Sequence, residues 1–237
     1  MPILAVDTTT RTCSVAVVSR SRLLFEMTTD NDETHTLHLM GMVDQALVQA
    51  GISLDALDGF AVTRGPGSFT GLRIGLSSVK GLSMATGKPI VPVSSLEVLA
   101  VQARSISNAS DLIVSVIDAY RREVFLAGYR FQDNQMIEVM GETVIKPDQV
   151  AELTTGVPGN VIFVGNGAVA YREKLAGRLK PGAHIRFAPD NLHVIRAATV
   201  GEIGLDRLDT GGMTAADIMP VYLRKSDAQI HLASSTR

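Results

Sequence analysis

The chain has 237 residues, 46% of them hydrophobic, and a formal net charge of −2 at pH 7. Its length allows one large domain or two smaller ones, and its charge gives no preference for a free nucleic-acid backbone. No run approaches the roughly 18 apolar residues of a membrane span, and the apolar start is short and interrupted by Asp7, unlike a signal peptide. We therefore expect a cytoplasmic protein without a membrane segment, in which the single cysteine, Cys13, fills a core in a reducing compartment.

Apolar periodicity and turn residues predict the elements of the first half. Three strands joined by short polar turns form a meander, and helices then alternate with buried strands. In chain order these are strands 3–7, 13–18 and 22–28, a helix at about 35–50, strand 59–63, a helix at about 69–86, strand 90–93 and a helix at 95–104.

The second half restarts after a polar segment at 104–111 and repeats the same order. Its strands are expected at 112–117, 123–129, 136–140, 161–164 and 184–187, and its helical pieces near 148–153, 167–177 and 191–206. Each half thus begins with three strands, and an aspartate, Asp7 or Asp118, ends the first of them. We expect two domains, 1–106 and 107–237, with the second including a C-terminal tail.

The turn before the helix at 69–86 carries the most distinctive run of the chain, Thr-Arg-Gly-Pro-Gly-Ser-Phe-Thr-Gly-Leu-Arg-Ile-Gly at residues 63–75. Glycine tolerates positive φ and proline pre-sets its own φ, so Gly-Pro-Gly predicts a tight turn. Ser68 or Thr70 is a suitable N-cap, and Gly87 followed by Pro89 is a suitable stop.

Small residues line one side of this helix: Gly71, Gly75, Ser78 and Ala85 share less than about a quarter of its circumference. An interior glycine costs about 1 kcal/mol relative to alanine, so the stripe indicates close approach of another backbone. Three interpretations stay open: packing within the same molecule, a partner's helix on the stripe, and anion binding at the helix N-terminus.

The run 63–75 resembles the signature of the bacterial TsaB (YeaZ) family, and the resemblance spans almost the whole chain. Further matches are residues 3–9 (Ile-Leu-Ala-Val-Asp-Thr-Thr), His35, residues 93–96 (Val-Ser-Ser-Leu), 117–124 (Ile-Asp-Ala-Tyr-Arg-Arg-Glu-Val) and 220–224 (Pro-Val-Tyr-Leu-Arg). The resemblance implies a non-catalytic paralogue of TsaD in tRNA threonylcarbamoyladenosine biosynthesis. Together with the duplicated element order, it implies an α/β fold of two ribonuclease-H-like lobes, as in the actin/Hsp70/sugar-kinase (ASKHA) superfamily.

The same resemblance implies the partners. Proteins of this family pair with TsaD through the helices at 35–50 and 69–86, can form a homodimer through the same helices, and work with the ATPase TsaE. Contact with tRNA is expected only indirectly, through that complex. The helix at 35–50 is apolar on two faces, which favours a covered surface. We expect the interface to include Leu39, Met42, Ala46, Gly71, Gly75, Ser78 and Leu82.

Active members of the superfamily hold ATP between the lobes, in turns that usually contain glycine. The turns after Asp7 and Asp118 contain none. We therefore expect no catalytic residues, no required cofactor and at most a vestigial nucleotide site, with a nucleotide at the partner interface left open. Its residues would be Asp7, Thr8, Thr9, Asp118, Gly165 and Gly167. The alternative is an active nucleotide-dependent phosphotransferase or ATPase of the same fold, and a metallopeptidase is a more distant one.

Two histidines and a basic cluster complete the candidates. His35 and His38 are three residues apart and could touch one ion, but no third ligand can be named. TsaD carries its metal-binding histidines four apart in a longer pattern that is absent here, so we expect no metal site. Arg172, Lys174, Arg178 and Lys180 have helical spacing, and we expect them to form a solvated face. Ser68 has no paired base, so we do not expect a nucleophile there.

Overall fold

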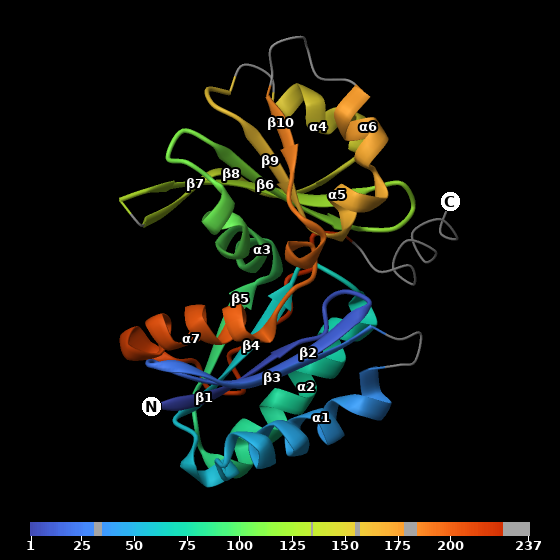
Figure 1. Ribbon diagram of the computed structural model, residues 1–237. Coiled ribbons are helices and arrows are strands. Elements are labelled where there is room, and N and C mark those ends of the chain that lie inside the picture. Colours follow the sequence, from blue (N-terminus) through green and yellow to red (C-terminus); the bar gives the residue numbers. More distant parts are fainter. Residues whose placement is uncertain (31–34, 134, 155–156, 178–183, 225–237) are drawn as a thin grey trace, which may run out of the picture.

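Two sheets with helices on their faces lie one above the other in the computed structural model, which describes residues 1–30, 35–133, 135–154, 157–177 and 184–224 (Figure 1). The lower sheet has the strand order β3-β2-β1-β4-β5. Its strands are β1 (Pro2–Asp7), β2 (Thr12–Ser19), β3 (Arg22–Asp30), β4 (Gly59–Gly65) and β5 (Ile90–Ser94). Strand β1 pairs antiparallel with β2 and parallel with β4, so the meander and the helix-linked strands meet at β1.

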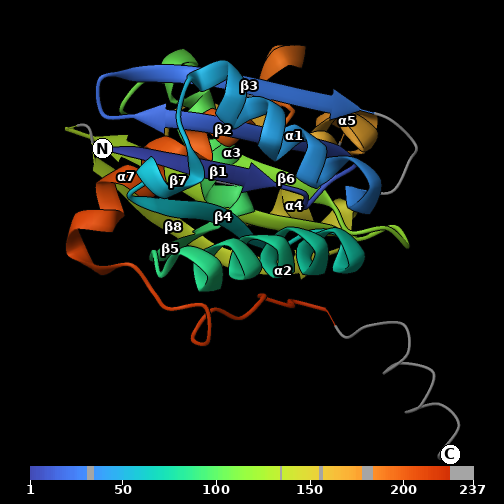
Figure 2. The same cartoon turned by 90° about the horizontal axis from the view of Figure 1, so that it is seen from below.

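Helices cover both faces of the lower sheet. Helices α1 (His35–Ala50) and α2 (Phe69–Thr86) lie on the outer face, and α7 (Ala197–Gly211) lies on the other (Figures 1 and 2). Successive side chains of a strand point to opposite faces. Accordingly Leu4 and Val6 belong to the core beneath α1 and α2, and Ile3 and Ala5 to the core beneath α7.

The upper sheet repeats this topology, with the order β10-β9-β6-β7-β8. Its strands are β6 (Leu112–Asp118), β7 (Val124–Gln132), β8 (Gln135–Ile145), β9 (Val161–Val164) and β10 (Ile185–Phe187), and its helices are α4 (Pro147–Leu153), α5 (Asn166–Ala170) and α6 (Arg172–Gly177). Strand β6 pairs antiparallel with β7 and parallel with β9, as β1 does with β2 and β4. The predicted α/β fold of two ribonuclease-H-like lobes is confirmed.

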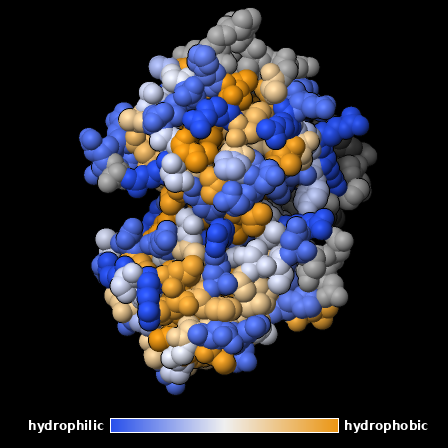
Figure 3. Space-filling view, viewed as in Figure 1, coloured by the Kyte–Doolittle hydropathy of each residue, from blue (hydrophilic) through white to orange (hydrophobic). Residues whose placement is uncertain are grey.

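Helix α3 (Ser95–Ala103) lies between the lobes, and Figure 3 shows the surface hollowed on one side between them. One apolar core runs through α3 from the lower lobe to the upper, including Ile3, Leu96 and Ile117. The lobes also meet where Ser94 Oγ donates to the Glu142 carboxylate. The expected boundary near residue 106 falls in the short 3-10 helix η2 (Arg104–Ile106) that follows α3.

The end of the chain returns to the first lobe. Helix α7 packs against β1, β2, β4 and β5, and Met213 then pairs with Ile90 beside β5. All residues from 107 to 237 were expected in the second lobe, but α7 packs on the first. Helix α7 lies so close to the lower sheet that a Cβ on Gly204 would overlap Ala61 and approach Ile3.

Two predicted helices have different bounds. The helix expected at 167–177 is interrupted at Tyr171, where φ is −114° and ψ is 21°, so α5 and α6 are separate. The helix expected at 191–206 begins only at Ala197, after the 3-10 helix η3 (Asp190–Leu192) and an extended Arg196. Among the described residues, no helix combines the length and apolarity needed to cross a membrane.

Candidate functional site

The turn after β1 is buried, and one oxygen of Asp7 takes up most of its side-chain hydrogen bonds. Asp7 is 0% exposed. Its Oδ1 accepts hydrogen bonds from the Thr9 amide (3.2 Å), the Thr9 hydroxyl (2.6 Å) and the Thr63 hydroxyl (2.6 Å). Its Oδ2 is buried without a partner among the described residues. Burial raises the pKa of Asp7, and the hydrogen bonds from Thr63 and Thr9 oppose that shift.

The glycine-rich turn of the same lobe covers the turn after β1. The Ser68 amide donates to the Thr9 carbonyl (2.7 Å), and the Thr8 hydroxyl donates to the Gly71 carbonyl (2.7 Å). A Cβ on Gly67 would overlap Thr9, and one on Gly71 would overlap the Thr8 carbonyl. Thr8 and Thr9 are each 1% exposed, so the glycine-rich turn and α2 leave almost none of the turn after β1 open to solvent.

The small-residue stripe therefore packs within the molecule at its N-terminal end. Gly71 and Gly75 are buried, and a Cβ on Gly75 would overlap the Thr8 hydroxyl. The expectation that these two glycines meet a partner is wrong; of the three open interpretations, close packing within the same molecule holds for them. Ser68 caps α2 by accepting from the Gly71 amide (3.2 Å), and Gly87 ends it in the left-handed conformation, as predicted.

Helix α1 packs on the sheet with the face that was expected to meet a partner. Its buried residues are Leu39, Met42, Val43 and Ala46, and they pack on the lower sheet. Leu39, Met42 and Ala46 therefore cannot line a partner surface. Leu37 is 72%, Met40 48% and Val48 67% exposed instead. Because the helix is apolar on two faces, its sequence does not say which face meets the sheet, and the expected choice is wrong.

Helix α2 adds small and apolar residues on its exposed side. Ser77, Gly81, Met84 and Ala85 are exposed, Met84 by 77%, and Ser78 and Leu82 are half-buried. Nothing lies within 4 Å of a Cβ built on Gly41 or Gly81. We call this surface the outer helix face: Leu37, Met40, Gly41 and Val48 of α1 with Ser77, Gly81, Met84 and Ala85 of α2. Figure 3 shows apolar side chains at the lower edge of the lower lobe, where α1 lies.

Most of these residues were not among the expected interface residues. The i, i+4 spacing of Leu37 with Gly41, and of Ser77 with Gly81 and Ala85, places them on common helix faces and could have indicated this surface.

In the upper lobe, three of the predicted nucleotide-site residues come together. The Asp118 amide donates to Asn166 Oδ1 (3.0 Å), and Asp118 Oδ1 accepts from the Tyr120 amide (2.9 Å) and the Tyr171 hydroxyl (3.3 Å). A Cβ on Gly167 would lie 2.9 Å from the Asp118 amide nitrogen, and one on Gly165 would overlap the Val116 carbonyl. These glycines allow a close strand-to-helix turn, and they belong to a different sheet from Asp7.

The histidines at the start of α1 have structural partners. His35 Nε2 lies 2.9 Å from the Thr10 carbonyl and donates to it, which leaves Nδ1 buried and without a partner among the described residues. His38 is half-buried. Across the described part of the chain, no group of three or more His, Cys, Asp and Glu side chains could hold a metal ion. The absence of a metal at His35 and His38 stays a prediction.

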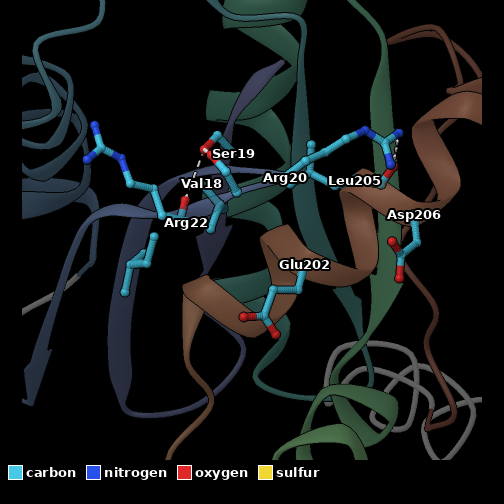
Figure 4. A pocket seen from close by; sticks show the side chains of 9 residues that line it. Val18, Ser19, Arg20, Arg22, Glu202, Leu205 and Asp206 are labelled. Atoms are coloured by element: carbon cyan, nitrogen blue, oxygen red, sulfur yellow. Dashed lines mark hydrogen bonds between the residues drawn. The ribbon is translucent and has the colours of Figure 1, made fainter. Parts of the chain in front are cut away.

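A second hollow, of about 420 Å³, lies between the β2–β3 hairpin and α7 (Figure 4). Arg20 and Arg22 extend in opposite directions from the hairpin, while Glu202 and Asp206 project from α7. Arg20 pairs with Asp209, and burial together with Asp206 raises the pKa of Glu202. This hollow lies away from both turns and from the outer helix face.

Two sheets of one topology, each with an aspartate ending its first strand, give this protein the fold of the actin/Hsp70/sugar-kinase class. A ROK hexokinase from Thermus thermophilus, 13% identical, superposes with a TM-score of 0.50 over 89% of this chain and 100% of the hexokinase. That likeness concerns the fold alone.

Sequence comparison is more specific. The pattern of the family described as "TsaD: tRNA N6-adenosine threonylcarbamoyltransferase" matches residues 25–232. The tRNA threonylcarbamoyladenosine biosynthesis protein TsaB of Escherichia coli is 35% identical over 96% of each chain, and that of Haemophilus influenzae is 32% identical over 94% of each. YeaZ from Pseudomonas aeruginosa, 31% identical, superposes with a TM-score of 0.77 over 94% of this chain and 99% of that one. The chain belongs to the TsaB (YeaZ) family.

Proposed function

We propose that this protein is a non-catalytic subunit that binds TsaD through the outer helix face and supports formation of threonylcarbamoyladenosine next to the anticodon of tRNAs. It would then be an accessory subunit of the transferase complex rather than an enzyme by itself. The proposal draws on the family, whose members are named for tRNA threonylcarbamoyladenosine biosynthesis. The single observation that carries the partner contact is the outer helix face.

Exposed apolar side chains on neighbouring helices favour association. Burial of apolar surface contributes about 25 cal/mol per Å², and Leu37, Met40, Val48 and Met84 are 48–77% exposed. Gly41 and Gly81 leave open space beside them, so a partner's helix can approach the backbone closely. This chain matches the sequence pattern of the TsaD family. TsaD as a partner would therefore have a related fold and could offer equivalent helices to the contact. A second copy of this chain can do the same, which supports a homodimer through the same face.

The covered turn supports a role without independent chemistry. Thr8 and Thr9, which follow Asp7, are buried against α2 and its preceding turn, and the Ser68 hydroxyl caps α2. No cofactor is required in this proposal. A nucleotide at the partner interface remains open, and TsaE would contribute the ATPase of the complex.

The test is sedimentation of the protein mixed with TsaD, together with measurement of tRNA modification by the reconstituted complex. Met40→Glu on the outer helix face should weaken pairing at least tenfold, because a charge would replace an apolar contact. Ile137→Glu on β8 is the matched control, since Ile137 is 42% exposed and Met40 is 48% exposed. Equal pairing by both variants would overturn the interface. Sustained ATP turnover by the purified chain alone, lost in Asp7→Ala or Asp118→Ala, would overturn the non-catalytic role in favour of a phosphotransferase.

A further inference from the structure

The β6–β7 turn has a strained backbone. Tyr120, Arg121 and Arg122 all have positive φ, at 58°, 52° and 63°. This region disfavours residues that carry a Cβ, and glycine is the residue that adopts it without strain. The turn is closed by the Ala119 amide, which donates to the Glu123 carbonyl (3.0 Å), and by the Glu123 amide, which donates to the Tyr120 carbonyl (3.0 Å). Three residues that are not glycine are therefore held where glycine would fit more easily.

Their side chains are presented to solvent. Tyr120 is 61% exposed, and Arg121 and Arg122 are exposed beside it. Residues held in such conformations concentrate at functional sites, because the surrounding structure must offset the strain. Here the Arg224 guanidinium fixes the turn from outside by donating to the Ala119 carbonyl (2.6 Å). The backbone thus displays one aromatic ring and two cations together.

Further cations and aromatic rings come from α5–α6. Tyr171 donates to Asp118 beside the turn, and burial and then Asp118 raise the pKa of Tyr171 while the nearby Arg122 charge opposes the shift. Lys174 Nζ lies 5.7 Å from the centre of the Tyr171 ring, and Arg172 Cζ lies 4.6 Å from that of Phe187. We call this surface the basic turn patch: Tyr120, Arg121, Arg122, Tyr171, Arg172 and Lys174.

Cations outnumber carboxylates in the two segments that form the patch. Residues 118–124 and 171–174 carry four cations and three carboxylates, Asp118, Glu123 and Glu173, and Glu123 pairs with Arg224 (3.5 Å). The whole chain has a formal net charge of −2, so this local excess of positive charge is not a general property of its surface. Two arginines beside an exposed tyrosine match the chemistry of a polynucleotide, in which phosphates alternate with flat bases. An acidic peptide would use the cations but would leave the tyrosine face without a planar partner.

We propose that the basic turn patch contacts the RNA substrate of the complex, with the arginines and Lys174 against phosphates and the Tyr120 ring stacked on an unpaired base. This rests on the proposed function, and it departs from the expectation that tRNA is met only indirectly through the partner. It also changes the interpretation of Arg172 and Lys174, which the sequence analysis assigned to a solvated face. Arg178 and Lys180 lie outside the described residues.

The test measures binding of a fluorescent, unmodified tRNA transcript to the complex of this protein with TsaD, by anisotropy at several salt concentrations. Arg121→Ala with Arg122→Ala should lower affinity about tenfold or more and reduce the salt slope by about 1.5, since each phosphate contact contributes about 0.7–0.9. The matched control removes two cations from the β2–β3 hairpin, Arg20→Ala with Arg22→Ala, and should change neither quantity appreciably.

Tyr120→Ala should lower affinity roughly fivefold to tenfold without changing the salt slope, because stacking releases no counterions. Arg121→Gly with Arg122→Gly guards against misfolding: glycine relieves the strain, so the melting temperature should hold or rise while RNA binding falls. Equal RNA affinity for the turn and hairpin double variants would overturn the proposal. Sedimentation of the same samples measures pairing with TsaD separately from RNA binding. If the two proteins do not pair, the RNA affinities of the same variants are compared on this protein alone at low salt, and the turn variants should again bind more weakly than the hairpin control.

Discussion

Thr8 and Gly75 are in direct contact across the first lobe: the Thr8 side chain occupies the space that a Cβ on Gly75 would need. The same hydroxyl donates a 2.7 Å hydrogen bond to the Gly71 carbonyl, one turn earlier on α2. The turn after β1 and helix α2 are thereby held together by backbone and small side chains. This contact decides what a substitution on the small-residue stripe does.

Gly75→Leu should destabilise the protein itself. An isobutyl group cannot fit against Thr8, and overpacking costs about 1–3 kcal/mol or more. For a protein of this length that corresponds to a fall in melting temperature of roughly 2–12 °C. Thermal melting of the isolated protein measures it. A wild-type melting temperature would show that α2 can move away from Thr8 without cost.

Gly81→Leu should leave the stability of the protein intact and weaken its pairing with TsaD. Nothing lies within 4 Å of a Cβ at Gly81, and leucine forms helix better than glycine by up to about 1 kcal/mol, so the melting temperature should hold or rise slightly. Pairing with TsaD should fall about tenfold or more if the outer helix face meets its helices, because about 1.4 kcal/mol is a factor of ten. Sedimentation with TsaD gives the affinity. Gly75→Leu is the paired comparison, since both glycines lie on one helix and differ in what surrounds them.

Asp7→Asn should raise the free energy of unfolding at pH 7. Burial raises the pKa of Asp7 in the folded protein above its ordinary value of 3.8, so the folded state favours the protonated form. Its contribution to stability is fully present below the unfolded pKa and is lost as pH rises through the folded pKa. Asparagine stays neutral, so its advantage should appear at neutral pH and shrink as the pH falls toward 4. Denaturant unfolding from pH 4 to pH 8 tests this, and a variant less stable than wild type at pH 7 would contradict it.

His193→Gln should make stability less sensitive to acid. The Gly165 amide donates to His193 Nδ1 (3.0 Å), and burial lowers the pKa of His193 below its ordinary value of 6.5. A histidine whose folded pKa is lowered leaves stability intact above the unfolded pKa and reduces it as pH falls from about 6.5 toward the folded pKa. Glutamine does not titrate and can keep an acceptor near Gly165. Between pH 7.5 and pH 5 the free energy of unfolding should therefore fall less for the variant than for the wild type, and an equal fall in both would exclude His193 as the titrating group.

The sequence by itself determined what depends on neighbouring residues along the chain. The strands of both meanders, the bounds of α1 and the caps of α2 at Ser68 and Gly87 follow from periodicity and turn chemistry, which act over one or two turns of backbone. The duplicated order of elements likewise indicated two lobes of one topology, because short connections restrict how such strands can pair.

The tertiary structure alone decided which of two similar surfaces is buried. Leu37 and Leu39 are the same residue type two positions apart on α1, yet one is 72% and the other 1% exposed. Their difference depends on how α1 is rotated on β2 and β3, which is a sum of contacts distant in sequence. Gly75 meeting Thr8 is another such contact, and so is the return of α7 to the first lobe. A local pattern records that a face is apolar or small, and only the packed chain specifies what that face meets.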